Sequence, residues 1–424
     1  MISLSLYDNL PRRNIIVIDM KSFFATVECV ERNLDPFSTP LVVAEPGRNG
    51  AMTLAVTPYM KSLGVGSRTR IYEIPSNIKY RTVPPRMGKY VEYSQKVVDI
   101  YKSFVSPDDL HIYSIDECFL DVTDYLKMYN MTDYELAQKI MKTIADKTGL
   151  ISTAGIGPNM LIAKIAMDIE AKHSKDNIAK WNYEDIPQKF WPISPLSDFW
   201  GIGRRMQKNL NDMGILTIGD LANYDKKKLK SKFGIIGEEM WNHANGIDLA
   251  RIGDYNTDPK DKSYGHSQVL FKDYTFDNIG IIIREMVEVL TGRLRRNKKK
   301  CRVIGFGIGY SKAYGGGFYH SRKIPASTDD LETILAVCNN IFQKFYEDYP
   351  IRKVSISLSG LEHNNIEQLN LFESYDERIK KKSINNTVDE IKNKFGKNSI
   401  IKASNLLKDS TMIERNKKRG GHRE

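Results

Sequence analysis

Three carboxylates could form a metal site, because each stands at the end of an apolar run or inside one. Asp19 ends the run NIIVID at 14–19, which is typical of a central, fully buried strand. Asp116 and Glu117 interrupt the apolar stretch YSIDECFLD at 113–121. Burying charged carboxylates is costly unless cations accompany them. Brought together, the three predict a site for two Mg²⁺ ions, which would stabilise the attacking and leaving oxygens of an in-line phosphoryl displacement.

The same residues also allow a purely structural interpretation. An isolated Asp-Glu pair is typical of a polar hairpin turn, and Asp19 could cap the helix that we expect to begin near Ser22. The strand-like flanks of the pair and the basic residues described next favour the metal site.

Two lysines could bind an anion beside the carboxylates. Lys164 lies in the apolar helical pattern LIAKIAMDI, where a lone amine would be costly without a partner. Lys61 follows a short strand-like stretch, and GVGSRTR adds Arg68 and Arg70. Lysine is a common phosphate ligand. The alternative for each residue is a solvated or snorkelling cation.

Two aromatic residues follow Asp19 closely. Phe23 and Phe24 could pack against a nucleotide sugar and exclude a 2′-hydroxyl group. The alternative is a core position, which suits Phe23 better than Phe24.

Three further motifs concern nucleic acid or a protein partner. FWGIGRRMQKNL resembles a helix-hairpin-helix, in which Gly201 and Gly203 would expose backbone N–H groups to a DNA phosphate, and FGIIGEEMW is a weaker second copy. RLRRNKKKCR at 293–302 has seven basic residues and no acid, which favours contacts with duplex phosphates. QLNLF at 368–372 is an apolar pentapeptide in a polar stretch, suited to anchoring in the groove of a partner.

The motif GFGIGY at 305–310 partly mimics a glycine-rich nucleotide loop. It lies within an expected strand and no helix follows it, so we reject a dinucleotide site.

Composition narrows the class of protein. The chain has 424 residues, a net charge of +11 and four widely spaced cysteines. The charge favours a polyanionic partner. The absence of CxxC motifs argues against a disulfide framework or a zinc site. No secretory signal or long apolar segment is apparent, so we expect a cytoplasmic protein without a membrane span.

Apolar periodicity predicts a mixed α/β unit, then a small helical domain, then a compact α+β domain. A polar, charge-rich C-terminal segment follows, and its last dozen residues are expected to be a disordered basic tail. The expected strands are 14–19, 41–44, two within 110–123, 151–157, and those in VLFKDYTF, VIGFGIGYS, FYHSRKI and KVSISLSGL; the expected helices are 89–104, 133–147, 160–172, 278–296 and 329–346.

In combination, four motifs resemble the Y-family translesion DNA polymerases, in particular the UmuC-like branch (ImpB/MucB/SamB type). The motifs are IDMKSFFATVE, YSIDECFLDVT, AGIGPNMLIAKIA and WGIGRRMQKNL. They occur in the family's order, and the resemblance extends from about Asn14 to Phe372.

The resemblance implies an α+β multidomain fold shaped as a right hand. The implied domains are palm (1–28 and 86–172), fingers (29–85), helix-hairpin-helix thumb (173–249), linker (250–263), α+β little finger (264–361) and a clamp-binding segment with basic tail (362–424).

The resemblance also implies roles for the residues. Two Mg²⁺ ions, for which Mn²⁺ could substitute, would bind Asp19, Asp116, Glu117 and the Met20 carbonyl. Phe24, beside Phe23, would be the steric gate against ribonucleotides, and Lys61 and Lys164 would bind the triphosphate of a dNTP. Primer–template DNA would contact Gly201, Gly203, Arg293, Arg295, Arg296 and Lys298, and a sliding clamp would bind Gln368, Leu369, Leu371 and Phe372 of a monomeric enzyme.

Two positions depart from the family pattern. Lys21 replaces a small polar or acidic residue, and Pro58 stands where many members carry a triphosphate-contacting tyrosine; Tyr59 is one place later. The main hypothesis is low-fidelity synthesis past damaged bases, as in the DNA-damage (SOS) response. The alternatives are a non-enzymatic DNA- or clamp-binding factor that has kept the fold, and a two-metal nuclease.

Overall fold

The computed structural model describes residues 7–47, 50–256, 262–363, 375–419 and 422–423. The chain forms two compact units, Met1–Asp258 with His422–Glu424, and Pro259–Gly421. Each unit is described by itself.

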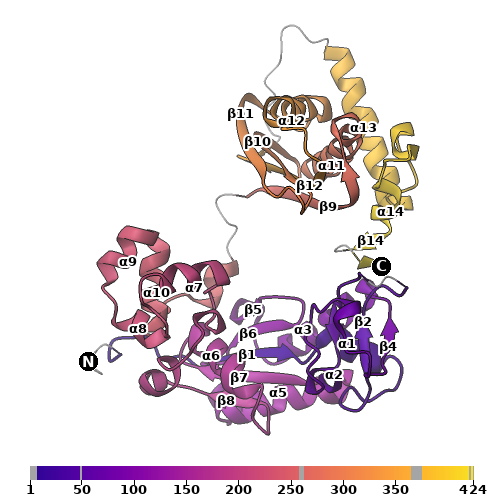
Figure 1. The fold of residues 1–424 in the computed structure, drawn as a ribbon. Coiled ribbons are helices and arrows are strands. Elements are labelled where there is room, and N and C mark those ends of the chain that lie inside the picture. Colours follow the sequence, from indigo (N-terminus) through magenta and orange to yellow (C-terminus); the bar gives the residue numbers. More distant parts are fainter. Residues whose placement is uncertain (1–6, 48–49, 257–261, 364–374, 420–421, 424) are drawn as a thin grey trace. The chain divides into compact units, whose positions relative to one another are not determined.

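The first unit is built on a five-stranded sheet of order β5-β6-β1-β7-β8 (Figure 1). β1 is the central strand and pairs antiparallel with both β6 and β7. The expected strand–turn–strand at 110–123 is present as β5 and β6. The strands are β1 (Ile15–Met20), β5 (Leu110–Ile112), β6 (Glu117–Asp121), β7 (Ser152–Gly157) and β8 (Ile178–Lys180).

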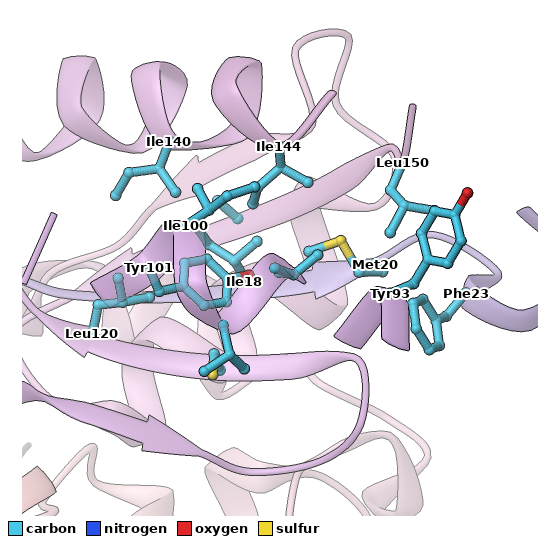
Figure 2. Packing of buried hydrophobic residues seen from close by; sticks show 14 of the residues in the cluster. Ile18, Met20, Phe23, Tyr93, Ile100, Tyr101, Leu120, Ile140, Ile144 and Leu150 are labelled. Atoms are coloured by element: carbon cyan, nitrogen blue, oxygen red, sulfur yellow. The ribbon is translucent and has the colours of Figure 1, made fainter. Parts of the chain in front are cut away.

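Both faces of this sheet are covered, as the continuous apolar run of β1 predicts. Ile16 and Ile18 point into one core, while Ile15 and Val17 point into another. Figure 2 shows the first core, where Ile140 of α5 lies above the sheet. The register of β1 is therefore held from both sides.

Helical segments pack around the sheet. α5 begins with a capping box of Thr132 and Glu135 and ends at Gly149, whose φ is 70°, as helix-end rules predict. The expected helix 160–172 divides into an α-helix and a π-helix. The segments are α1 (Phe23–Val30), α3 (Met87–Lys102), α4 (Leu126–Tyr129), α5 (Asp133–Thr148) and α6 (Met160–Ala166), which continues as the π-helix η4 (Met167–Ala171).

The helix α1 begins near Ser22, as expected, and Ser22 occupies its N-cap position. Its φ is 48° and its side chain caps no backbone N–H. Instead, Thr26 N–H donates to the Ser22 carbonyl oxygen at 3.0 Å.

The segment between α1 and α3, hereafter the fingers segment, corresponds to the expected fingers domain (29–85). It contains a three-stranded sheet of order β3-β2-β4 and a small core of its own around Val42, Val56 and Met60. Its elements are β2 (Leu41–Val43), β3 (Ala55–Val56), α2 (Pro58–Ser62), the 3₁₀ turn η2 (Ile71–Glu73) and β4 (Arg81–Val83).

The expected small helical domain is present and packs on the second palm core, which includes Trp181 and Phe190. Its elements are η5 (Tyr183–Asp185), η6 (Ile186–Phe190), η7 (Leu196–Asp198), α7 (Arg204–Asn211), α8 (Ile218–Asn223), α9 (Lys226–Phe233), α10 (Ile235–Ala244) and η8 (Ile252–Asn256).

The second unit contains a sheet of order β11-β10-β12-β9 packed against two helices around one core. The GFGIGY motif lies inside β10, as expected. A Cβ at Gly305 would stand 2.1 Å from the Tyr319 hydroxyl, so the glycine makes room for a cross-strand tyrosine. The elements are β9 (Tyr264–Tyr274), α11 (Phe276–Arg296), β10 (Lys299–Tyr310), β11 (Gly317–Thr328), α12 (Leu331–Phe345), β12 (Ile351–Ser359) and β13 (Glu362–His363).

The C-terminal segment is more structured than its composition predicts. The expectation of a disordered tail over the last dozen residues is wrong for residues 413–419, which carry most of α14 and the strand β14. Met412 in this segment is 3% exposed. The elements are α13 (Tyr375–Phe395), η9 (Ala403–Leu406), α14 (Met412–Asn416), β14 (Lys418–Arg419) and β15 (His422–Arg423).

A buried carboxylate of α11 holds this segment in place. Glu285 is 1% exposed and accepts from the Thr411 N–H at 3.1 Å, from the Thr411 hydroxyl at 3.0 Å and from the Ser410 hydroxyl at 2.5 Å. Arg415 adds an ion pair at 3.7 Å. Charge-assisted bonds of this kind are strong when they are buried.

We expect Glu285→Ala to release the residues around Thr411 while the little-finger core persists. Losing a buried charge partner costs about 2–3 kcal/mol of local stability, so tryptic cleavage at Lys408 should accelerate about thirtyfold or more. Glu332→Ala is the matched control, because Glu332 pairs with Arg284 at an exposed position. Equal cleavage of Glu285→Ala and wild type would contradict the role of Glu285.

Candidate active site

The pairing of β1 with β6 brings two of the predicted carboxylates opposite each other. Asp19 is the penultimate residue of β1 and faces Glu117, the first residue of β6. The Met20 N–H donates to the Asp116 carbonyl oxygen at 3.0 Å. The expected hairpin therefore delivers all three acidic residues to one end of the sheet.

Burial disfavours the charge on both facing carboxylates. The Asp19 side chain is 20% exposed. Burial raises its pKa to about 7, and the neighbouring charges of Asp116 and Glu117 add to the effect while Lys172 opposes it. The Glu117 side chain is 9% exposed, and its pKa is also raised, chiefly by burial. Cations nearby would stabilise the ionised forms of both.

The Asp116 carboxyl group accepts a hydrogen bond from the Ser114 hydroxyl at 2.6 Å. In the described part of the chain, no group of three or more His, Cys, Asp or Glu side chains is arranged to hold a metal ion. Glu117 Oε1 is buried, and its partner in this structure is the Lys164 ammonium group at 2.8 Å. Carboxylate and carbonyl oxygens from Asp19, Asp116, Glu117 and Met20 form an all-oxygen donor set, which fits Mg²⁺ chemistry.

A row of alternating charges on one helix lies beside these carboxylates. Lys164 Nζ is 2.8 Å from Glu117 Oε1 and 3.2 Å from Asp168 Oδ2. Lys172 Nζ is 2.7 Å from Asp168 Oδ1 and 3.7 Å from Asp19 Oδ2. The predicted anion partner of Lys164 is thus a protein carboxylate here.

Burial alone would lower the Lys164 pKa, but the attraction of Glu117 and Asp168 outweighs it and raises the pKa. Asp168 and Lys172 escaped the sequence analysis. Asp168 is four residues after Lys164 and Lys172 is four residues after Asp168, and this spacing was the available signal, because such residues share a helix face.

Lys61 and Lys21 add positive charge near Asp19. The pKa of Lys61 is lowered, chiefly by desolvation. The charge of Asp19 opposes this effect, and the charge of Lys172 adds to it. Desolvation also lowers the pKa of Lys21, as do the charges of Lys61 and Lys172. Lys21 Nζ donates to the Asn177 side chain at 2.5 Å. Three like charges crowded together favour a polyanionic ligand.

Pro58, one of the two departures from the family pattern, has a structural role in helix α2 (Pro58–Ser62). Pro58 is the first residue of α2, and the Thr57 hydroxyl caps that helix. The Tyr59 N–H donates to the Pro36 carbonyl oxygen at 3.3 Å. Pro58 therefore starts a helix, a position that proline tolerates well.

The two phenylalanines have different environments. Phe23 is 2% exposed and belongs to the palm core, so the packing interpretation is right for it and a direct nucleotide contact is not. Phe24 is half-buried, and its ring lies 4.7 Å from the ring of Tyr90.

The glycine hairpins open onto helix starts. Gly201 has a φ of 92°, and Gly203 is the N-cap of α7 with no side-chain cap. A Cβ at either glycine would meet nothing within 4 Å, so the backbone there is open to approach. Gly234 repeats the arrangement with a φ of 65° before α10.

The basic run at the end of α11 is only partly available to DNA. Arg293, Arg296 and Lys298 are exposed. Arg295 instead donates to both carboxylate oxygens of Asp389 at 2.7 Å and 3.1 Å. Bidentate pairing with a carboxylate competes directly with a phosphate, so the expectation that Arg295 is free for DNA is wrong in this conformation.

The QLNLF motif, with Gln368, Leu369, Leu371 and Phe372, lies outside the described residues. No helix of the described ranges combines the length and apolarity that a bilayer span needs.

Three family models match the chain in succession. They are the impB/mucB/samB family over residues 18–168, the DNA polymerase-iota thumb domain over 197–248 and the impB/mucB/samB C-terminal domain over 261–371. These ranges follow the palm and fingers, the helical domain and the little-finger sheet.

Relatives match over nearly the whole chain. The putative UV-damage repair protein UvrX of Bacillus subtilis (strain 168) is 39% identical over 98% of this chain and 99% of its own length. DNA polymerase IV 2 of the same organism is 34% identical over 96% of this chain and 98% of its own length.

A solved structure shares the fold. The Y-family DNA polymerase chimera Dbh-Dpo4(243-245)-Dbh is 20% identical, with a TM-score of 0.65, and the match covers 83% of this chain and all of that one. The solved structure shows the fold, and the family models and relatives show that the chain belongs to the impB/mucB/samB family and is a DNA-directed DNA polymerase.

Proposed function

We propose that the chain is a low-fidelity, template-directed DNA polymerase that extends a primer past damaged bases. The observation that carries this proposal is the acidic pair Asp19 and Glu117 beside three crowded lysines. Acidic ligands next to an anion site suit nucleotidyl transfer from a dNTP, in which the primer 3′-hydroxyl attacks the α-phosphate and pyrophosphate leaves.

The acidic residues would hold two Mg²⁺ ions, with Asp19, Asp116 and Glu117 as ligands together with the Met20 carbonyl. Bound there, the ions supply charge stabilisation to the attacking and leaving oxygens. For this role the half-buried Asp116 carboxyl group would exchange or share the hydrogen bond that it accepts from Ser114.

The lysines bind and orient the triphosphate in this proposal. Lys61, Lys21 and Lys172 present ammonium groups that already repel one another, so a polyanion relieves an existing cost. In this proposal, their positive charge takes the place of the triphosphate-contacting tyrosine that Pro58 replaces. Lys164 keeps Glu117 charged and reaches the nucleotide only by exchanging that partner.

The proposal of a DNA polymerase also includes its partners. Primer–template DNA contacts the Gly201–Gly203 hairpin and the exposed cations Arg293, Arg296 and Lys298. A sliding clamp binds QLNLF, and the enzyme acts as a monomer in the cytoplasm. The names of the relatives, which refer to UV-damage repair and DNA polymerase IV, support a role in damage tolerance.

The first experiment measures extension of a primed template with Mg²⁺ and dNTPs, on intact DNA and opposite an abasic site. We expect the double variant Asp116→Asn, Glu117→Gln to lose at least about a hundredfold in rate, or about 2.7 kcal/mol of transition-state stabilisation. Asp121→Asn is the control, because Asp121 ends the same strand and accepts from Thr123.

Primer–template binding by the double variant should persist, which separates lost chemistry from lost DNA binding. Wild-type protein that binds DNA but never extends it, even with a clamp, would instead favour the non-enzymatic DNA-binding factor. Degradation of DNA without dNTPs would favour a nuclease.

Lys61→Met tests the triphosphate site. We expect the KM for dNTP to rise about tenfold, because one ammonium–phosphate contact contributes about 1.5–3 kcal/mol. Lys102→Met, at the exposed end of α3, should leave KM unchanged. An unchanged KM for Lys61→Met would remove Lys61 from the proposed site.

Phe24→Ala tests the sugar gate. Removing the ring makes room for a 2′-hydroxyl, so we expect the preference for dNTP over rNTP to fall by about a hundredfold or more, a contrast typical of steric exclusion. Single-nucleotide insertion measures kcat/KM for both sugars. A preference equal to that of wild type would exclude Phe24 as the gate.

A further inference from the structure

A buried carboxylate lies directly behind the proposed sugar gate. The Glu28 side chain is 0% exposed. Arg86 donates to both of its oxygens, from Nε at 3.0 Å and from Nη2 at 2.9 Å. The Tyr90 hydroxyl donates to Oε1 at 2.8 Å, and Arg32 forms an ion pair with Oε2. A buried charge held by this many donors has one favoured geometry.

This cluster joins the two points where the fingers segment meets the palm. Glu28 lies on α1, from which the chain enters the fingers, and Arg86 is the N-cap of α3, where the chain returns. Breaking a buried charge network leaves charges uncompensated, which is strongly unfavourable. The cluster therefore fixes α3 against α1.

Tyr90 links the Glu28 cluster to Phe24, because its hydroxyl binds Glu28 and its ring packs against the Phe24 ring. The Tyr90 residue is fully buried, and its ring is 4.7 Å from the Phe24 ring at an interplanar angle of 41°. Phe23 is 5.4 Å from Phe24 and 6.5 Å from Tyr90. Phe24 is thus half-buried against a ring whose hydroxyl end is tied to Glu28.

We propose that Tyr90 and Glu28 are positioning residues for sugar selection: the Tyr90–Glu28 hydrogen bond sets where the Phe24 ring stands relative to the 2′ position of the incoming nucleotide. The proposal rests on the function proposed above, in particular on Phe24 as the gate. A steric filter depends on placement to a fraction of an ångström, so loosening its support admits the larger sugar before it harms the smaller one.

Tyr90→Phe is the decisive variant, because it removes one hydroxyl and keeps the ring against Phe24. We expect kcat/KM for rNTP to rise and the preference for dNTP to fall about threefold to tenfold, the effect of one hydrogen bond of ordinary strength. The kcat/KM for dNTP should stay within about twofold of wild type. A general loss of structure would lower kcat/KM for rNTP and for dNTP together and leave the ratio of the two values unchanged.

Tyr93→Phe is the matched control. Tyr93 lies on the same helix as Tyr90, and its hydroxyl donates to Glu31 at 2.9 Å. This bond is equivalent to that of Tyr90, but it belongs to a different ring from the one that supports Phe24. Its sugar preference should equal that of wild type. An equal fall in Tyr93→Phe and Tyr90→Phe would overturn the proposal, because the effect would then belong to α3 in general.

Glu28→Gln provides a second test, and thermal unfolding establishes first that the variant is folded. We expect a fall in sugar preference at least as large as in Tyr90→Phe. If Phe24→Ala lowers the preference but Tyr90→Phe does not, the positioning role is overturned and the gate stands. If Phe24→Ala has no effect, the gate itself fails and the positioning role fails with it.

Discussion

The register between β1 and β6 is the constraint on which the active site depends. It places Asp19 opposite Glu117 at the end of a sheet whose two faces are both buried. A slip of one residue would send every side chain of β1 to the opposite face. Because Ile15 and Val17 fill one core while Ile16 and Ile18 fill the other, such a slip would have to repack both.

The register also creates an electrostatic cost that the neighbouring helix offsets. The two largely buried carboxylates, Asp19 and Glu117, repel each other. Lys164 and Lys172, which lie on either side of Asp168 along the α6–η4 helix, offset this repulsion. Lys164 and Lys172 both pair with Asp168, so the single charge of Asp168 does not fully neutralise either ammonium group. That balance leaves the site responsive to other charges, because a cation or a polyanion can exchange with a partner already present.

Apolar periodicity predicted the helices and strands that form the two palm cores, since those elements follow their local pattern. Composition failed for the C-terminal segment, because the carboxylate that binds Ser410 and Thr411 is Glu285 on α11, more than a hundred positions earlier. The same holds for Arg295, whose partner Asp389 is 94 positions away. In the site, the strand ends predicted Asp19 and Glu117, whereas the orientation of Asp116 toward Ser114 is a side-chain choice that no periodicity encodes.

The Glu28 cluster bears on how a tolerant polymerase would stay selective for sugar. Tolerance of damaged bases requires room around the template base and the incoming base. Selection against a 2′-hydroxyl requires a rigid wall at one other place. In this chain the wall would be Phe24 on α1, supported by Tyr90 on α3 and by a carboxylate with no exposed surface. A rigid support within the palm would let the fingers accommodate varied bases without moving the sugar wall, so loose base selection and strict sugar selection are physically compatible in one site.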